Sequence, residues 1–401
     1  MSGIAGGLTG AGIVASKDDV YVQTGQYRLK GWQTVAITRS IETMPNSFAV
    51  TASAEFLQSA AALAGTTPGQ PCSIYIGNDL VITGRIDRRT INIGARQHTI
   101  SIVGRGLTRN LVDCSADLLR DPGLSSGTMN FASVFDLATR LARSYGVYVV
   151  PPPPGELLKA IEIPAMTLNL GETPYEIVES AARYAGYLVY ENEYGNLVLS
   201  RVGTEKMASG FTMGQNIEDF HVEFSVDQRY SDYVVVWTTV DQLSHELGLS
   251  NIRALPKHGS DETLGEYRLK VIVSEQNTPA YEFGQVRADW EMARRIGRSQ
   301  AISLTCDSWR DSADKLWTPN CLAYVTAPQA DIGGVKWIIG TVTLRKDMSG
   351  THADLVLMPP DAFLPEPKPL TLYDAQLTLS PTIAQAPAPP STDPPSTPGV
   401  P

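Results

Sequence analysis

The sequence predicts a mainly β protein with α+β parts: two antiparallel β-barrels related by internal duplication, an α/β module and an inserted domain. Three observations lead to this fold class. Apolar and polar residues alternate with a period of two in an N-terminal and a C-terminal region of the 401-residue chain. These two regions share a spacing of glycines and apolar strands. Helical spacing with clear capping signals is concentrated between them.

Residues 18–113 are predicted to form the first barrel. Pairs of apolar residues flank single polar ones, as Ile74 and Ile76 do. This is the pattern of antiparallel strands with one buried face. The Ala-rich stretch 54–65 interrupts the alternation as a helix or a loop excursion. The Gly-rich residues 1–17 before the barrel are interpreted as a flexible arm.

Residues 114–210 are predicted to form the α/β domain, which opens with a helix. Apolar residues recur at helical spacing from Phe131 to Ala142, behind possible N-caps at Thr128 and Asn130. Four prolines at 151–154 then force an extended segment.

A second helix in this domain has sharper signals. Thr173 is an N-cap, Pro174 takes the first helical position, and Glu176 completes a capping box. Gly186 supplies the C-terminal stop. A hairpin follows around the dipeptide Gly195-Asn196, a common turn composition.

Alternation returns in the C-terminal part of the chain. Residues 211–240 and 300–360 are predicted to form the second barrel, and 241–299 an inserted domain with a helix over 280–297. Residues 361–401 form a Pro-rich tail whose composition cannot bury enough apolar surface to fold alone.

An internal repeat links the two strand-rich regions. Gly84 aligns with Gly340, and ten residues later Gly94 aligns with Gly350. An apolar strand follows each: Ile100 and Ile102 match Val356 and Met358, or Leu355 and Leu357 after a one-residue slip. Upstream, PCSIYI mirrors PNCLAYV. Any two β-meanders share alternation and glycine turns, but equal spacing favours duplication. A trimer would then present six similar barrels around one axis.

Composition and charge narrow the function classes. Charged residues make up 18% of the chain, below the roughly 25% of an average soluble domain, which suggests surfaces that face protein. The net charge of −10 disfavours general attraction to DNA, because non-specific binding depends on Lys and Arg. No run of about 18 apolar residues predicts a membrane span, and no basic cluster marks a secretory signal at the N-terminus.

No catalytic, cofactor-binding or metal-ligating residue is predicted. HELGL at 245–249 lacks the second His of a zinc-protease helix. The glycine-rich run 6–12 follows no strand and opens no helix, so it is not a phosphate loop. The cysteines form no CxxC pair and are interpreted as free thiols; they are Cys72, Cys114, Cys306 and Cys321.

The other polar and aromatic candidates receive structural interpretations. Asp18-Asp19 and the pair Glu191 and Glu193 are interpreted as solvated turn charges rather than a glycosidase pair. The tryptophans favour core or interface packing, with a sugar-binding platform as the alternative; they include Trp32, Trp237, Trp309, Trp317 and Trp337. The histidines, interpreted as strand or loop residues, are His98, His221, His245, His258 and His352.

Three runs of sequence resemble the Mu-like phage tail protein family, the baseplate hub proteins. The first is DDVYVQTGQYRLKGWQTVAITRSIETMPNSF, which is similar to the opening of the family. The others are RSQAISLTCDSWRDSADKLWTPNCLAYVTAP and VKWIIGTVTLRKDMSGTHADLVLMPPDAF. The resemblance covers residues 18 to 363 and follows the domain order throughout.

The resemblance implies a homotrimeric ring with two tail-tube-like barrels per subunit. It implies as partners a tail tube or tube-adaptor ring, a separate trimeric spike and baseplate wedge proteins, with a tape-measure protein as a further candidate. The spike is expected on another chain, because a Pro-rich tail follows the second barrel. Candidate contacts between subunits are the strand edges of the barrels and the helix 280–297.

The function expected is that of a structural hub in a contractile phage tail, which joins a three-fold spike to a six-fold tube and nucleates baseplate and tube assembly. It would act by geometry, without catalysis or a cofactor, around an acidic lumen that DNA passes without specific binding. The expected location is the virion baseplate, after assembly in the host cytoplasm. The alternatives are a tail-associated carbohydrate-binding protein and a cell-wall hydrolase.

Overall fold

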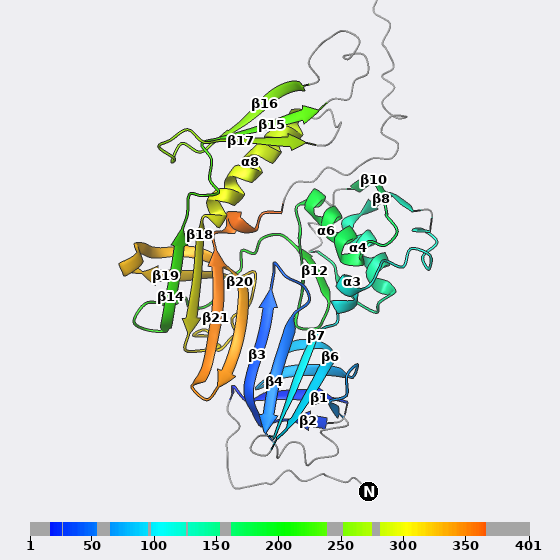
Figure 1. The fold of residues 1–401 in the computed structure, drawn as a ribbon, viewed down its shortest axis with the longest axis vertical. Helices are drawn as coiled ribbons and strands as arrows, with labels where there is room; N and C mark the ends of the chain where they lie inside the picture. The colour runs from blue at the N-terminus through cyan, green and yellow to red at the C-terminus, as the bar shows by residue number, and fades with distance from the viewer. Residues whose placement is uncertain are drawn as a thin grey trace, which may run out of the picture.

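A computed structural model describes residues 17–25, 27–53, 65–94, 98–125, 127–152, 162–238, 252–274 and 281–365 (Figure 1). Several sequence predictions fall outside the described residues. They concern the N-terminal arm up to residue 16, the Ala-rich residues 54–64, the HELGL run at 245–249 and the tail beyond Pro365.

One large sheet dominates the fold and confirms the mainly β class. Thirteen strands take part, and nearly all neighbours are antiparallel. The N-terminal group comprises β1 (Val20–Thr24), β2 (Tyr27–Leu29), β3 (Trp32–Ser40), β4 (Ser47–Ser53), β5 (Pro71–Ile76), β6 (Asp79–Ile93) and β7 (His98–Gly106). The C-terminal group comprises β13 (Phe211–Thr212), β14 (Ile217–Phe224), β18 (Gln300–Cys306), β19 (Leu322–Ala327), β20 (Ile332–Asp347) and β21 (Gly350–Met358).

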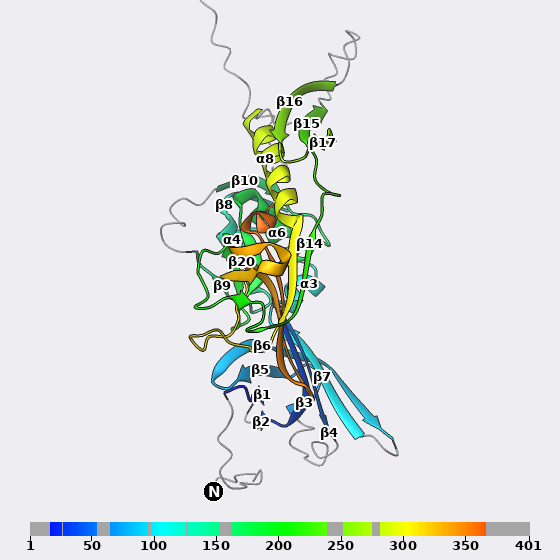
Figure 2. The same cartoon turned by 90° about the vertical axis from the view of Figure 1, so that its left-hand side faces the viewer.

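The same strand order occurs twice within this sheet. The first unit runs β3-β4-β7-β6-β5, and the second runs β14-β18-β21-β20-β19. The two units meet where β20 pairs with β3, so both belong to one continuous sheet. Figure 2 shows β6 and β7 extending as a long pair away from the short strands β1, β2 and β5.

Three irregularities recur at equivalent places in the two units. Gln33 is the extra residue where β3 pairs with β4, and Glu218 is the extra residue where β14 pairs with β18. Asp87 interrupts the pairing of β6 with β7, as Gly340 interrupts that of β20 with β21. A third shift occurs between β5 and β6 and again between β19 and β20. Because a bulge fixes the local register, the units share register as well as strand order.

The glycine alignment drawn from the sequence is wrong by three residues. By the matching bulges, Gly340 corresponds to Asp87 and not to Gly84, and Leu355 corresponds to Ile102. Each glycine has its own local cause. A Cβ on Gly84 would lie 2.1 Å from the carbonyl oxygen of Arg105, whereas one on Gly340 would lie 2.7 Å from the ring of Phe363.

Alternation along the strands places one face of each unit in a shared core. Ile37 of β3 lies opposite Leu344 of β20, and the two side chains are 0% and 2% exposed. Trp309 and Trp317 belong to the same cluster and are almost fully buried. Each fully buried large side chain contributes about 1.5–3 kcal/mol, so the two units stabilise each other.

A second domain of helices and short strands follows the first unit. It contains α3 (Arg109–Asp113), β8 (Thr128–Ser133), α4 (Val134–Arg143), β9 (Val149–Val150), β10 (Glu162–Thr167), α6 (Pro174–Ala185), β11 (Leu188–Glu191) and β12 (Leu197–Ser200). The capping box at Thr173, the left-handed stop at Gly186 and the following hairpin are confirmed. The caps expected at Thr128 and Asn130 are wrong, because these residues lie in β8 and Ser133 caps α4.

A third region extends beyond the large sheet at the top of Figure 1. It consists of β15 (Asp232–Thr238), β16 (Ile252–Ser260), β17 (Leu269–Ser274) and α8 (Tyr281–Arg298). The sequence assigned residues up to 240 to the second barrel. In the structure β15 pairs with β16 and β17, so it belongs to the inserted sheet.

The start of the predicted tail is ordered against the inserted helix. The turn η2 (Pro360–Phe363) packs on α8, and Phe363 is 2% exposed. Trp290 and Arg294 of α8 both donate hydrogen bonds to the carbonyl oxygen of Leu364. The expectation of a tail that does not fold is therefore wrong for residues 361–365, which pack against the inserted helix.

Candidate assembly interface

The junction of the two units shows how one unit joins the next edge to edge. Thr38 and Thr343 share a hydroxyl hydrogen bond of 3.0 Å across β3 and β20, and Ser40 and Thr341 share one of 2.9 Å. Six consecutive residue pairs form this antiparallel ladder. The junction is therefore held by backbone bonds, hydroxyl pairs on one face and the apolar core on the other.

Two strands equivalent to those of the junction have unpaired edges within the described residues. β14 occupies the position of β3 in its unit and pairs with β18, and its other edge carries only an isolated bridge at Ile217. β6 occupies the position of β20. Its first half pairs with β5, but residues 88–93 pair with β7 alone. Unpaired strand edges are templates for further pairing.

Exposed apolar side chains gather on these two edges. Ile91 and Ile93 of β6 are 39% and 75% exposed, although they lie on the face that is buried elsewhere in the sheet. Phe224 of β14 is 58% exposed. Phe220 and Val222 are partly buried against the core. Contiguous exposed apolar groups of this kind mark interaction sites.

The two edges carry opposite charges. β14 carries Glu218, Asp219 and Glu223, whereas the open part of β6 carries Arg88 and Arg89. Such complementarity favours the meeting of one edge with the other rather than of two like edges.

The face of the sheet opposite the core is covered by small hydroxyl side chains. Apart from two valines, its apolar members are alanines. Its arginines are Arg88, Arg105 and Arg345, of which Arg105 and Arg345 are paired with carboxylates. The hydroxyl members of this face include Thr34, Thr38, Ser47, Thr51, Ser101, Ser303, Thr305, Thr341 and Thr343.

Glu191 fastens the second domain to the first unit. It is 3% exposed and accepts hydrogen bonds from the backbone N–H groups of Asn46, at 2.8 Å, and Thr108, at 3.0 Å. Burial raises the pKa of its carboxyl to about 7, and the two backbone donors oppose that rise. Glu193 nearby accepts a bond of 3.1 Å from Arg39. The interpretation of this pair as solvated turn charges is therefore wrong.

Arg310 fastens the second unit to the first. Its guanidinium is 5% exposed and lies 3.0 Å from Asp18 and 2.6 Å from Asp79. It also donates to the carbonyl oxygens of Lys17 and Ile76. Asp18 is thus also an interdomain partner rather than a solvated charge.

The remaining sequence candidates lie apart from one another. His352 contacts Glu218 at 2.6 Å, and His221 lies on exposed β14. The four cysteines are free, and burial raises the pKa of Cys72 to about 12 and that of Cys306 to about 11. Among the tryptophans with described side chains, Trp32 and Trp337 are buried, as expected for core residues.

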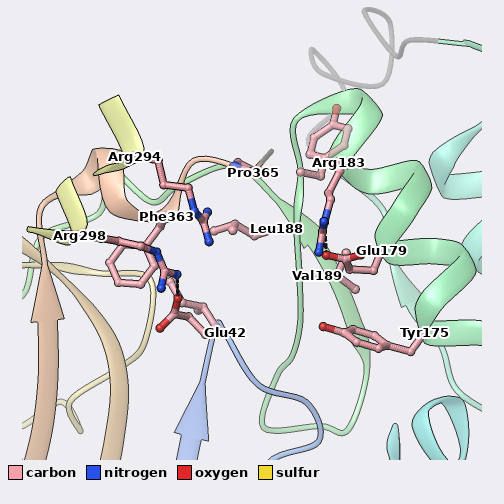
Figure 3. Close-up of a pocket in the computed structure, with 12 residues that line it drawn as sticks. Glu42, Tyr175, Glu179, Arg183, Leu188, Val189, Arg294, Arg298, Phe363 and Pro365 are labelled. Carbon is pink, nitrogen blue, oxygen red and sulfur yellow. Dashed lines mark hydrogen bonds and ion pairs between the residues drawn. The ribbon is translucent and has the colours of Figure 1, made fainter. Parts of the chain in front are cut away.

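A cleft of about 290 Å³ lies between the second domain and the inserted helix (Figure 3). Its charged groups are engaged, Arg294 with the carbonyl oxygen of Leu364 and the others in ion pairs. Arg183 pairs with Glu179, and Arg298 pairs with Glu42. Over the described ranges, no cluster of three or more potential metal ligands occurs, and no helix is long and apolar enough to cross a membrane.

The strand edges of the barrels were expected as contacts between subunits, but the sequence did not specify which residues form them. The structure shows the reason for the open edge of β6, since β6 has 15 residues and its partner β5 has only 6. The excess half of such a strand has to find another partner or remain open on one side.

Three family models match successive parts of the chain. They are "Mu phage baseplate assembly protein GpP-like, N-terminal" over residues 19–106, "Baseplate hub protein gp44-like, second domain" over 108–201, and "Mu phage baseplate assembly protein GpP, fourth domain" over 280–366.

Similar proteins of known sequence or structure are also phage tail or related secretion-system proteins. Baseplate hub protein gp44 of Escherichia phage Mu is 28% identical over 337 residues, which cover 83% of this chain and 86% of that protein. The crystal structure of the 43 kDa tail protein of prophage MuSo2 from Shewanella oneidensis has a TM-score of 0.73 at 27% identity, covering 88% of this chain and 100% of that one. The c3393 protein of E. coli, a type VI secretion component, shares the fold at a TM-score of 0.52 and 8% identity, covering 87% and 80%.

Proposed function

Because the chain belongs to the Mu-like phage baseplate hub proteins, we propose that three copies close into a ring at the centre of a contractile tail. The observation that carries this proposal is the repeat. Two units of equal strand order are joined edge to edge, and among the described residues no further strand pairs with the equivalent edges. A head-to-tail contact of this kind generates a ring when its rotation closes.

A ring of three chains contains six equivalent units. It can therefore offer three-fold symmetry to a separate trimeric spike on one side and approximate six-fold symmetry to a tail tube or tube-adaptor ring on the other. The second domain and the inserted domain extend outside the repeated sheet (Figure 1), where baseplate wedge proteins would bind. Such a ring would nucleate assembly by geometry, without catalysis or a cofactor.

The hydroxyl-rich face would line the channel of the ring, because the opposite face is filled by the core. The acidic side chains on this face include Asp219, Glu223 and Asp354, in keeping with the expected acidic lumen. Hydroxyl groups, carboxylates and arginines that mostly pair with carboxylates offer passing DNA few free cations, so its phosphates would not be retained. A tape-measure protein would occupy the same channel before delivery.

Native mass measurement with negative-stain imaging of the purified chain tests the proposal. The expected result is a closed particle of three times the 43.4 kDa mass of one chain, formed alone or on addition of the trimeric spike. A species that stays monomeric, with and without the spike at micromolar concentration, contradicts it. Hydrolysis of purified cell-wall material by the chain would instead favour an enzyme.

A further inference from the structure

We infer that β14 of one subunit pairs with residues 88–93 of β6 in a second copy of this chain, in a register copied from the junction of β3 with β20. This inference rests on the proposed ring. In this arrangement the edge of β14 and the edge of β6 each pair with the other edge in a second copy of this chain.

Strand β14 is equivalent to β3. Both strands carry their extra residue at the same point, Glu218 in β14 and Gln33 in β3. On that alignment Val222 corresponds to Ile37 and Phe220 to Val35.

Strand β6 is equivalent to β20. Asp87 and Gly340 are the matching extra residues, so Arg88 corresponds to Thr341 and Ile91 to Leu344. In both strands the earlier half pairs with the equivalent neighbour, β5 or β19. The later half of β20 then pairs with β3, whereas that of β6 has no strand partner besides β7 within the part of the chain that the structure describes.

Transfer of the known junction register gives a specific ladder between subunits. Within the chain, Leu344 lies opposite Ile37 and Arg345 opposite Ala36. The equivalent pairs between subunits are Arg88 with Ser225, Arg89 with Phe224, Thr90 with Glu223, Ile91 with Val222, Asn92 with His221, and Ile93 with Phe220.

This register accounts for the exposed apolar side chains of both edges. Ile91 would meet Val222 as Leu344 meets Ile37, a pair whose members are 2% and 0% exposed. Ile93, which is 75% exposed in the single chain, would pack on Phe220. Cross-strand apolar pairs of this kind stabilise sheets.

The charges fit the same ladder. Arg88 would lie on the same face as Glu223 and two residues along from it, within reach of a long side chain. No like charges face each other in the six pairs. The opposite arrangement, β14 against β14, would bring the carboxylates of Glu218, Asp219 and Glu223 together.

Each copy presents one edge of each kind, so every edge is satisfied only when the last subunit meets the first. An isologous dimer, in which like edges pair, leaves the exposed isoleucines of β6 without the partners that the junction supplies. The second copy is therefore the occupant that the sequence of both edges fits.

Engineered disulfides test the register. In a Cys114→Ser background, Asn92→Cys combined with His221→Cys places two cysteines opposite each other, within the 4.4–6.8 Å Cα separation that a disulfide needs. The matched control combines Arg88→Cys with His221→Cys. These positions lie on the same edges and face but four residues apart in register, which is about 13 Å along the strand.

The expected result, under mild oxidation of assembled rings, is a ladder of linked dimers and trimers on a non-reducing gel for the first pair. The control pair and each single cysteine variant should stay monomeric on the gel. If rings of three subunits form but the first pair stays reduced, or the control links instead, the register is wrong and the ring stands. If no variant or wild-type chain assembles with or without the spike, the proposed ring itself fails.

Discussion

Asp87 and Gly340, 253 positions apart in the chain, occupy the same place in two copies of one β-sheet unit. Each is the extra residue where the longest strand of its unit pairs with the following strand. One is a carboxylate that bonds Arg105, and the other is a glycine packed under Phe363. The backbone irregularity has persisted while the side chain changed, so shared strand geometry marks the duplication better than shared residue type.

Replacement of Ile91 by aspartate should abolish the ring and leave the subunit folded. The side chain is 39% exposed in the single chain, so the monomer tolerates a charge there. Between subunits the carboxylate would face Val222 without a partner, at a cost of several kcal/mol. Native mass spectrometry should find monomers, with an unchanged circular dichroism spectrum. Leu119→Asp, at an 83% exposed position of the second domain, is the control that should still form rings.

The stability that the Glu191 carboxyl gives to the attachment of the second domain should decrease as the pH rises. Its pKa is raised to about 7 from 4.5 by burial, so the folded chain holds the proton more tightly than the unfolded chain. Stability from this group is complete below pH 4.5 and falls as the pH rises to 7. The shift corresponds to about 3 kcal/mol.

Urea midpoints at pH 5 and pH 8 measure this effect. Glu191→Gln resembles the protonated acid, so the drop in midpoint between the two pH values should be smaller than in the wild type. Parallel behaviour of the two proteins would mean that the carboxyl does not titrate in this window.

Replacement of Arg310 by alanine should separate the two units more easily. The change removes a guanidinium that bonds Asp18, Asp79 and two backbone carbonyls. Breaking a buried pair costs about 3–5 kcal/mol, but Asp79 is half exposed, so about 2 kcal/mol is expected. The thermal midpoint should fall by several degrees. Arg120→Ala, which removes an exposed pair at 3.8 Å, should leave the midpoint unchanged.

A double-mutant cycle should measure the hydroxyl pair at the junction. Thr38→Val leaves the hydroxyl of Thr343 without its 3.0 Å partner and should cost about 1 kcal/mol. Adding Thr343→Val removes both polar groups at once, so the double variant should be destabilised by less than the sum of the single changes. Additive costs from urea titrations would show that the two hydroxyls do not interact.

The sequence by itself determined the local features, because their causes lie within a few residues. Alternation fixed which face of each strand is buried, as for Ile74 and Ile76, both fully buried. The capping box at Thr173 satisfies backbone groups of its own first turn, so it could be identified without any knowledge of the fold. The likeness of the two strand-rich regions was also visible, although its register was not.

Only the tertiary structure decided which strands pair and which charges are buried. The pairing of β20 with β3 joins segments about 300 residues apart, and neither segment carries a local signal that identifies its partner. Glu191 became buried because Asn46 and Thr108, from two other segments, close over it. The open edges arise in the same way, from what the neighbouring strands leave unpaired. Such properties depend on long-range packing, which residue types and spacing along the chain do not specify.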